Sequence, residues 1–273
     1  MPELPEVEIT RQGINAAIQG RQVRHFVLRN GDLRWPVDPQ LAHILPGQVV
    51  CRVERRAKFL LLRMRGGTLL IHLGMSGFFR VVSPASPVGR HDHLDLVFED
   101  DTCLRYNDVR RFGAFLWTQD EPARHPLLVG LGPEPFDKRV DGSFLQDRFT
   151  GRAAPVKNVL MDQKVVAGLG NIYANEALFA AGISPLRAAG QLTRAQCDRL
   201  SVAVKEVLNR AIESGQQSLN RFYEPVTGEK PGYFPFVFAV YGRDNQNCSR
   251  CGKPITKIVQ AGRSTYFCSS CQS

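Results

Sequence analysis

The sequence contains no long hydrophobic run. Apolar stretches such as Phe59–Leu62 and Leu69–Ile71 span only three or four residues, whereas a helix needs about 20 apolar residues to cross a bilayer. The chain also opens without a basic leader followed by an apolar segment. From these two absences we expect a cytoplasmic protein with no membrane partner and no secretion signal.

Lysine is almost absent from the first half of the chain. Residues 1–137 hold 17 Lys+Arg, and Lys58 is the single lysine among them. An ammonium group can release its proton at an accessible pH, whereas a guanidinium group cannot. Lys58 is therefore a candidate for acid–base catalysis or phosphate binding. The alternative is that a single lysine occurs by chance in a chain that favours arginine.

The positive charge is concentrated in the second half. Residues 1–137 balance 17 Lys+Arg against 16 Asp+Glu, whereas residues 138–273 hold 18 against 10, out of a net charge of +9. A basic half suits a polyanionic partner such as nucleic acid, because phosphate neutralisation supplies most non-specific affinity. A solvated basic face would give the same balance.

Hydrophobic periodicity predicts an α+β protein of two domains, with a β-sandwich or barrel and an attached helix at the N-terminus and helices in the C-terminal part; the family resemblance given below favours the β-sandwich with flanking helices. One helix is expected at Val7–Ile18, with Gly20 as its stop signal. The expected strands are Gln22–Arg29, Gln48–Val53, Phe59–Met64, Leu69–His72, Phe78–Val82, Leu94–Phe98 and Ala114–Thr118. After a linker at Leu131–Pro135, helices are expected at Phe144–Phe149, Val156–Asp162, Ile172–Ala181 and Arg194–Ser214.

Four of the seven cysteines lie in the last 26 residues. They form two Cys-x-x-Cys pairs, Cys248/Cys251 and Cys268/Cys271, with sixteen residues between the pairs. This spacing predicts one structural Zn²⁺ held by four thiolates, with a β-hairpin carrying each pair. Two disulfides are the alternative, which a reducing cytosol disfavours. Arg263 lies in the polar segment between the pairs, where a rigid hairpin tip would direct it at a phosphate.

The segment Gly168-Leu-Gly-Asn171 lies between two predicted helices. Asn171 is a suitable N-cap for the helix expected from Ile172, and an exposed helix N-terminus is a phosphate site. With Lys157 on the preceding helix, the pattern predicts a helix–two-turn–helix that contacts the DNA backbone. The plain alternative is an ordinary turn.

Two further segments place apolar side chains beside glycines and arginines. Met75 lies within His72–Gly77, and Phe112 follows two arginines within Tyr106–Gly113. Such residues are usually core. Beside glycine and arginine they can also act as wedges that fill the gap left by a base flipped out of the stack.

Taken together, these motifs resemble the bacterial formamidopyrimidine-DNA glycosylase family. The residues that carry the resemblance run in order along the whole chain: MPELPE, HLGMSG, RRFGA, GLGNIYANEALF, KPGYF, YGR and the four-cysteine tail. The resemblance implies a bifunctional repair enzyme, a monomer acting on double-stranded DNA with oxidised bases or abasic sites and associated with the nucleoid. It excises 8-oxoguanine and formamidopyrimidines and then cuts the abasic strand by β,δ-elimination.

The resemblance also implies a role for the opening residues. Loss of Met1 leaves Pro2 as a secondary amine, which attacks C1′ of the damaged nucleotide and forms a Schiff base. Glu3 then resembles the general acid, and Glu6 an acidic residue near the base pocket. Lys58 resembles the lysine of β-elimination. Arg263 resembles the arginine credited with δ-elimination, although phosphate anchoring suits a guanidinium better than proton donation.

The DNA contacts implied by the resemblance fall into two groups. Met75, Arg110 and Phe112 fill the void, with Arg110 facing the orphan cytosine. The backbone contacts are His91, Arg152, Lys157 and Asn171, of which Arg152 stands where relatives often have lysine.

The implied domains are a catalytic domain at 1–131, a helix–two-turn–helix domain at 132–235 and a zinc finger at 236–273. A loop at 215–232 caps the extruded base, but its sequence departs from the more usual Gly/Thr/Ser-rich form. Two alternatives stay open. One is an endonuclease VIII-like enzyme for oxidised pyrimidines, whose members usually begin Pro-Glu-Gly-Pro where this chain has Pro-Glu-Leu-Pro. The other is a non-catalytic zinc-finger protein that only binds DNA.

Overall fold

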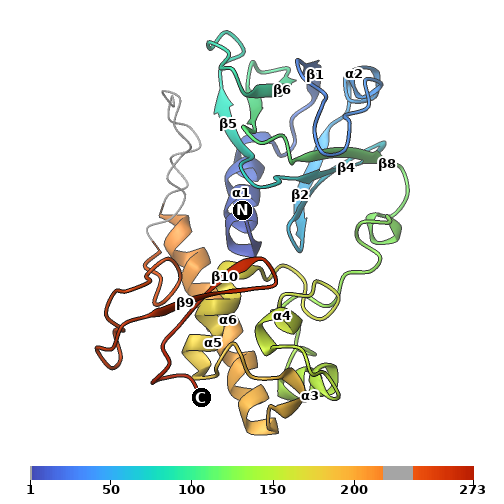
Figure 1. The fold of residues 1–273 in the computed structure, drawn as a ribbon. Coiled ribbons are helices and arrows are strands. Elements are labelled where there is room, and N and C mark those ends of the chain that lie inside the picture. The colour runs from blue at the N-terminus through green and yellow to red at the C-terminus, as the bar shows by residue number, and fades with distance from the viewer. Residues whose placement is uncertain (1, 218–235) are drawn as a thin grey trace. The chain divides into compact units, whose positions relative to one another are not determined.

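A computed structural model describes residues 2–217 and 236–273 (Figure 1). They form two compact units with a boundary between Val129 and Gly130. The N-terminal unit holds the described residues before this boundary together with residues 212–217, and the C-terminal unit holds the remaining ones. The boundaries of the three expected domains stay predictions.

Helix α1 (Leu4–Ile18) opens the N-terminal unit and begins three residues earlier than expected. Glu3 is its N-cap, Pro5 lies in the first turn, and Glu3 and Glu6 form a reciprocal capping box. Proline is well suited to a first helical turn, because the backbone N–H it lacks has no helical partner there. The crowded prolines and glutamates of the opening are therefore the start of the helix rather than a tail before it.

Two antiparallel four-stranded sheets follow α1. One has the order β2 (Val50–Arg56), β3 (Phe59–Met64), β4 (Gly67–His72) and β8 (Ala114–Thr118). The other has the order β1 (Val23–Leu28), β6 (Asp92–Phe98), β7 (Cys103–Asn107) and β5 (Phe78–Val82). Apolar residues from both sheets and from α1 belong to one buried cluster, so the predicted β-sandwich is confirmed. A short helix, α2 (Leu41–Ile44), and a 3₁₀ turn, η1 (Pro122–Arg124), were not expected.

Strand β7 was missed by the sequence analysis. Its middle residue is Arg105, which breaks the apolar pattern, yet Arg105 is 0% exposed. The guanidinium is compensated inside the sheet by a two-bond ion pair with Asp95, whose carboxylate oxygens lie 3.0 Å from Nε and Nη2. Burial of a charge with a matched partner is invisible to hydrophobic periodicity.

The helices predicted after residue 130 are present, with shifted ends, and all but the last residues of α6 belong to the C-terminal unit. They are α3 (Gly142–Phe149), α4 (Val156–Leu160), α5 (Asn171–Ala181) and α6 (Arg194–Gln216), with a 3₁₀ turn η2 (Ala189–Gln191) between α5 and α6. Because α6 continues to Gln216, the first residues of the predicted loop at 215–232 are helical. The part of that loop from residue 218 onward lies outside the described residues.

Helix α5 forms the centre of the C-terminal unit. It carries buried side chains around most of its circumference, and the hairpin of β9 (Thr256–Gln260) and β10 (Arg263–Phe267) packs against it. Phe179 of α5 joins Tyr266 and two of the tail cysteines in a small apolar cluster. The α+β class with a helical C-terminal part and a four-cysteine hairpin is therefore confirmed.

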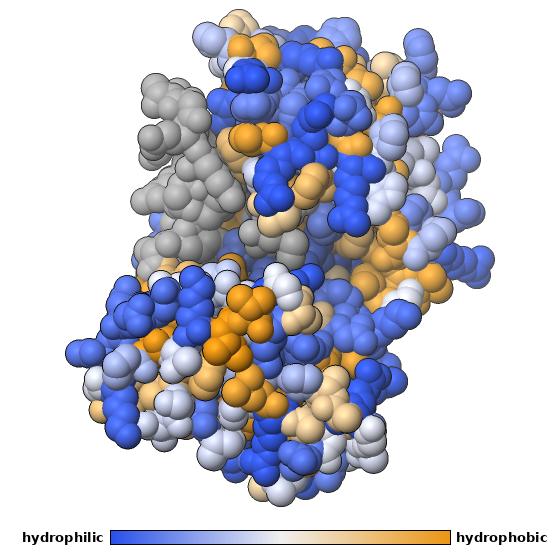
Figure 2. All heavy atoms as spheres, in the orientation of Figure 1, coloured by the Kyte–Doolittle hydropathy of each residue, from blue (hydrophilic) through white to orange (hydrophobic). Residues whose placement is uncertain are grey.

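Hydrophilic side chains dominate the visible surface, and apolar patches are scattered between them (Figure 2). Within residues 2–217 and 236–273, the structure contains no helix that is both long and apolar enough to span a membrane.

Candidate active site and nucleic-acid interface

Pro2 and Glu3 are both buried at the N-terminus of α1, and Glu3 is only 1% exposed. The Glu6 carboxylate accepts a hydrogen bond of 2.8 Å from the backbone N–H of Glu3. This contact fixes the backbone directly behind Pro2. The predicted nucleophile and its predicted general acid are thus consecutive residues at a rigid helix start.

Lys58 lies in the two-residue turn that joins β2 to β3, between the paired residues Arg56 and Phe59. It is 8% exposed. The residue before it, Ala57, has φ of 52°, a left-handed conformation that costs a non-glycine residue about 1–2 kcal/mol. The surrounding hairpin holds this strained turn in place, and with it the lysine.

His72, at the end of β4, is a neighbour that the sequence analysis did not select. Burial, together with the positive charges of Lys58 and Arg34, lowers the pKa of His72 from 6.5 to about 4, against an opposing effect of Asp108. The imidazole is therefore neutral at pH 7, and its Nδ1 accepts the N–H of Gly74 at 3.0 Å. Its position as the first residue of the HLGMSG motif was the available signal.

Two of the predicted wedge residues are large apolar side chains at the surface of the N-terminal unit. Met75 is 36% and Phe112 38% exposed, and the Arg110 guanidinium lies 4.7 Å from the centre of the Phe112 ring. Exposed apolar groups beside cations suit insertion between stacked bases better than a core role.

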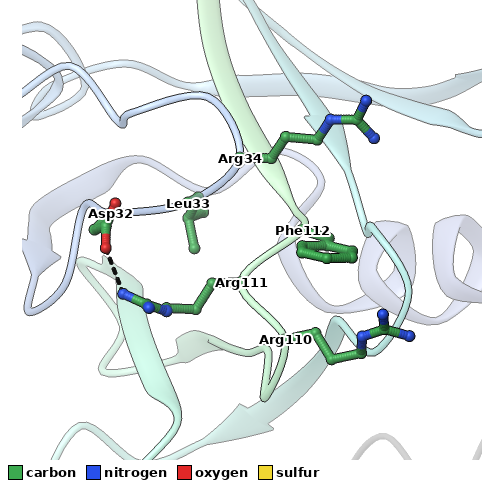
Figure 3. A pocket seen from close by; sticks show the side chains of 6 residues that line it. All are labelled: Asp32, Leu33, Arg34, Arg110, Arg111 and Phe112. Carbon is green, nitrogen blue, oxygen red and sulfur yellow. Dashed lines mark hydrogen bonds and ion pairs between the residues drawn. The ribbon is translucent and has the colours of Figure 1, made fainter.

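A pocket of about 290 Å³ adjoins this pair and is lined by Asp32, Leu33, Arg34, Arg110, Arg111 and Phe112. Figure 3 shows the Phe112 ring between Arg34 and Arg110, with Arg111 turned toward Asp32. Three arginines and one aspartate give the pocket a positive balance. Its chemistry fits an anion or the polar edge of a base.

Glycines allow the Met75 and Phe112 loops to touch. A Cβ atom on Gly74 would lie 2.4 Å from the backbone carbon of Phe112, and one on Gly113 would lie 2.0 Å from the Tyr106 hydroxyl. The backbone carbonyl of His91 accepts the N–H of Asp108 at 3.1 Å, so His91 also lies beside these loops. The structure thus brings Met75, His91, Arg110 and Phe112 to one region of the N-terminal unit.

In the C-terminal unit, Lys157 and Asn171 both hold the hairpin. Lys157 is 0% exposed, and its Nζ donates to the Thr265 hydroxyl at 2.6 Å and to the Ser264 carbonyl at 3.2 Å. Asn171 donates from Nδ2 to the same carbonyl at 2.9 Å. The expectation that Asn171 is an N-cap was wrong: Gly170 is the N-cap and Asn171 the first helical residue. The Asn171 side chain instead reaches across to β10.

Arg152 and Arg263 are both exposed. Arg152 follows α3 and donates from Nε to the Arg148 carbonyl at 3.1 Å. Arg263 begins β10 directly after a tight turn in which Ala261 and Gly262 have φ of 46° and 73°. Positive φ at both central residues is the geometry of a two-residue hairpin turn, and it places Arg263 at the tip.

Glu176 of α5 is a further residue that the sequence analysis missed. Its carboxylate is 4% exposed and accepts three backbone N–H groups, from Ala239, Val240 and Tyr241, at 2.8 to 2.9 Å. It thereby anchors the chain that leads into the four-cysteine region. An acidic residue inside a helix that is otherwise free of charge was the signal that could have revealed it.

The four tail cysteines converge, with all their sulfur atoms within 4.8 Å of one another. Sγ of Cys248 lies 3.9 Å from that of Cys271, and Sγ of Cys251 lies 3.5 Å from that of Cys268. A tetrahedral site with metal–sulfur bonds of about 2.3 Å separates its sulfurs by about 3.8 Å, whereas a disulfide bond is about 2.05 Å long. The four thiolates therefore fit a structural metal. One strand pair, β9–β10, connects the two cysteine pairs. The expectation of a hairpin for each pair was wrong, because the first pair lies in a turn closed by an isolated bridge between Asn247 and Pro254.

Family models match three consecutive parts of the chain. They describe a formamidopyrimidine-DNA glycosylase N-terminal domain at residues 1–115, a formamidopyrimidine-DNA glycosylase H2TH domain at 131–222 and a zinc finger found in FPG and IleRS at 245–273. A curated relative named formamidopyrimidine-DNA glycosylase, from Geotalea uraniireducens, is 50% identical over 272 residues and the match covers 100% of both chains.

Two solved structures show the same fold over the whole chain. The MutM (Fpg) protein of Thermus thermophilus has a TM-score of 0.83 at 39% identity, covering 99% of this chain and 98% of that one. The Lactococcus lactis Fpg (MutM), in complex with DNA containing N7-benzyl-Fapy-dG, has a TM-score of 0.88 at 32% identity and covers 99% of both chains.

A β-sandwich that begins with a buried proline–glutamate pair, together with a helix–two-turn–helix and a four-cysteine hairpin, defines the class of zinc-finger DNA repair glycosylases that act on damaged bases. Within that class, the chain belongs to the formamidopyrimidine-DNA glycosylase family.

Proposed function

We propose that this glycosylase excises oxidised purines, 8-oxoguanine and formamidopyrimidines, and then cuts the abasic strand. The support is family membership and the L. lactis relative, which binds a formamidopyrimidine lesion in DNA. The partner is double-stranded DNA with oxidised bases or abasic sites, on which the protein acts as a monomer in the bacterial cytoplasm.

The observation that carries the mechanism is the buried, capped start of α1. After removal of Met1, Pro2 is a secondary amine, and an α-amino group has a pKa near 8, so an appreciable fraction is unprotonated at neutral pH. Its lone pair attacks C1′ of the damaged nucleotide, and the bond from C1′ to the base breaks; the base leaves with the electron pair and takes up one proton, while the Pro2 nitrogen loses its own. Glu3 donates a proton to the sugar ring oxygen as the ring opens, and the nitrogen of Pro2 is left as an iminium ion on C1′.

Strand cutting follows from the iminium. It acidifies the C2′ proton, whose removal expels the 3′ phosphate in β-elimination, and Lys58 serves this step. Lys58 is 8% exposed and is held in the turn between β2 and β3, and an amine can exchange a proton where a guanidinium group cannot. Arg263 holds phosphate at the hairpin tip while δ-elimination releases the sugar.

DNA binding divides between the two units. Met75 and Phe112 fill the space of the extruded nucleotide, Arg110 faces the orphan cytosine, and Glu6 lies near the base pocket. His91, Arg152, Lys157 and Asn171 serve the DNA backbone. Two of the three N–H donors of the Lys157 ammonium are engaged with Ser264 and Thr265.

The metal of the tail is Zn²⁺, one ion per chain, held by Cys248, Cys251, Cys268 and Cys271. Four thiolates suit zinc in a structural site and leave no position for a reacting water. Its contribution is rigidity: it fixes the hairpin that carries Arg263.

Borohydride trapping tests the nucleophile directly. One protein preparation carries a short N-terminal extension, which makes the Pro2 nitrogen an unreactive amide, and proteolytic removal of the extension from the same preparation exposes the amine. On a duplex with 8-oxoguanine opposite cytosine, the exposed form should give a covalent adduct that maps to Pro2 by peptide mass, and the extended form should give none. Equal trapping by both forms would overturn the role of Pro2. Faster excision of thymine glycol than of 8-oxoguanine would overturn the lesion class.

A further inference from the structure

Asp108 is 0% exposed. Its carboxylate accepts hydrogen bonds from the two loops that carry Met75 and Phe112. Its Oδ1 accepts the Ser76 hydroxyl at 2.5 Å. Its Oδ2 accepts the backbone N–H of Gly113 at 2.9 Å and the Tyr106 hydroxyl at 3.1 Å. A buried carboxylate is tolerated only when such donors replace water, so these bonds hold one another in place.

Ser76 connects the two loops with a single hydroxyl group. It donates its proton to Asp108 and accepts the backbone N–H of Arg110 at 3.0 Å. Ser76 follows Met75 in sequence, and Gly113 follows Phe112. The backbone of Arg110 is therefore bonded to Ser76 directly. Met75 and Phe112 are each next in the chain to a residue of this network, Ser76 and Gly113.

The backbone of Asp108 adds further restraints. Its N–H donates to the His91 carbonyl at 3.1 Å, and its carbonyl accepts Nε2 of His93 at 2.7 Å. The same carbonyl accepts the N–H of Arg111 at 3.3 Å, closing a turn in which Arg111 has φ of 56°. A left-handed arginine persists only where its surroundings impose it.

From this network we propose that Ser76 and Asp108 are positioning residues, a latch that sets Met75, Arg110 and Phe112 in one arrangement before DNA arrives. The proposal rests on the void-filling role given to those residues under the proposed function. Insertion of a wedge unstacks a base step, which costs a few kcal/mol that binding must offset, and loops that are ordered only on binding would use part of the binding energy for their own ordering. The latch therefore matters for extruding a base that is present and stacked. It matters little at an abasic site, where no base has to be unstacked.

Ser76→Ala is the decisive variant, because it removes both hydrogen bonds with a change of one atom at a partly exposed position. Loss of a hydrogen bond to a charged group lowers the equilibrium constant for the bonded arrangement by roughly tenfold or more. Single-turnover excision of 8-oxoguanine should fall about tenfold, while cutting of a preformed abasic site stays within about twofold. Ser83→Ala, an exposed serine of the neighbouring loop before β6, should leave both rates unchanged.

Amide hydrogen exchange of the free protein supplies a readout that needs no substrate. The Arg110 N–H should exchange faster in Ser76→Ala, with unchanged protection in the core strands β4 and β6. If the wild type gave no adduct and no excision, the proposed function would fail. Amide exchange at Arg110 would still show whether Ser76 and Asp108 hold the loops in place. Unchanged Arg110 exchange, or equal loss of both activities in Ser76→Ala, would overturn the latch. Asp108→Asn is the second variant, since an amide cannot accept both Ser76 and Gly113 and should show the same selective loss.

Discussion

The ammonium of Lys157 donates a 2.6 Å hydrogen bond to the hydroxyl of Thr265, and both residues are fully buried. Lys157 belongs to α4 and Thr265 to β10, next to the tip that carries Arg263. The Thr265 hydroxyl in turn donates to Oε1 of Gln260 at 2.8 Å, across the hairpin. A lysine expected at the DNA surface is thus a strut between a helix and the four-cysteine hairpin.

Replacement of Lys157 by methionine keeps the volume and removes the donor. The Ser264 carbonyl and the Thr265 hydroxyl then lose a buried partner, which costs about 1–3 kcal/mol. We expect the urea midpoint of the variant to fall accordingly, and its affinity for abasic-site DNA to weaken.

Lys164→Met is the matched control, because Lys164 is exposed in the same unit and its loss removes the same charge. If Lys157→Met and Lys164→Met lost equal affinity for DNA and neither lost stability to urea, Lys157 would contribute only its charge.

Removal of the metal should release the hairpin. Cys268→Ser deletes one thiolate of a site that fits zinc, so the zinc content should drop from one ion per chain to nearly none, and DNA affinity should fall with it. The measurement is metal analysis beside a DNA-binding titration. Cys51→Ser, at an exposed cysteine outside the cluster, should change neither. Full metal retention and affinity in Cys268→Ser would contradict the four-thiolate assignment.

The stability of the N-terminal unit should depend on pH through His72. Burial, with the charges of Lys58 and Arg34, lowers its folded pKa to about 4, whereas the unfolded value is near 6.5. Between these values the unfolded chain binds more protons, so stability rises with pH there. The contribution, up to about 3 kcal/mol, is complete above pH 6.5 and is lost as the pH falls toward 4.

His72→Gln removes that titration, so the difference between wild type and variant should change between pH 6.5 and 4 in urea unfolding. His43→Gln, at an exposed histidine, should follow the wild type through the same window. Parallel curves for wild type and His72→Gln would show that His72 is protonated as easily in the folded protein as in the unfolded one.

Periodicity located strands and helices whose apolar faces are regular, and it failed where charge is buried. Strands β3, β5 and β8 have the predicted ends, because their apolar residues stop at polar or glycine-containing turns. Strand β7 was missed because Arg105 reads as a surface residue until Asp95 is placed opposite it. Pairing across strands is a tertiary property and leaves no local pattern.

The site shows the same division. Motif resemblance selected Pro2, Glu3, Lys58 and Arg263 as residues that face substrate, and the structure places the first three at fixed, buried positions. Supporting residues such as Asp108 and Glu176 were not selected, because their importance lies in donors from distant segments, such as the Ser76 hydroxyl and the N–H of Val240. Those donors become known only when the chain is folded.

The exposure of Phe112 leads to a prediction that separates function from stability. A side chain that is 38% exposed contributes less to folding than a core residue, and its surface cation–π contact with Arg110 is worth about 0.5–1 kcal/mol. Phe112→Ala should therefore lower the free energy of unfolding by no more than about 1 kcal/mol. Excision of 8-oxoguanine should fall by at least tenfold, because nothing then fills the space beside the orphan base. Val109→Ala is the control in the same loop, at a residue that is 57% exposed, and should leave both quantities near wild type. Thermal unfolding and single-turnover excision on the same preparations decide the outcome: a Phe112 variant that loses stability in proportion to activity would mean that the ring supports the fold of the loop and is not a wedge.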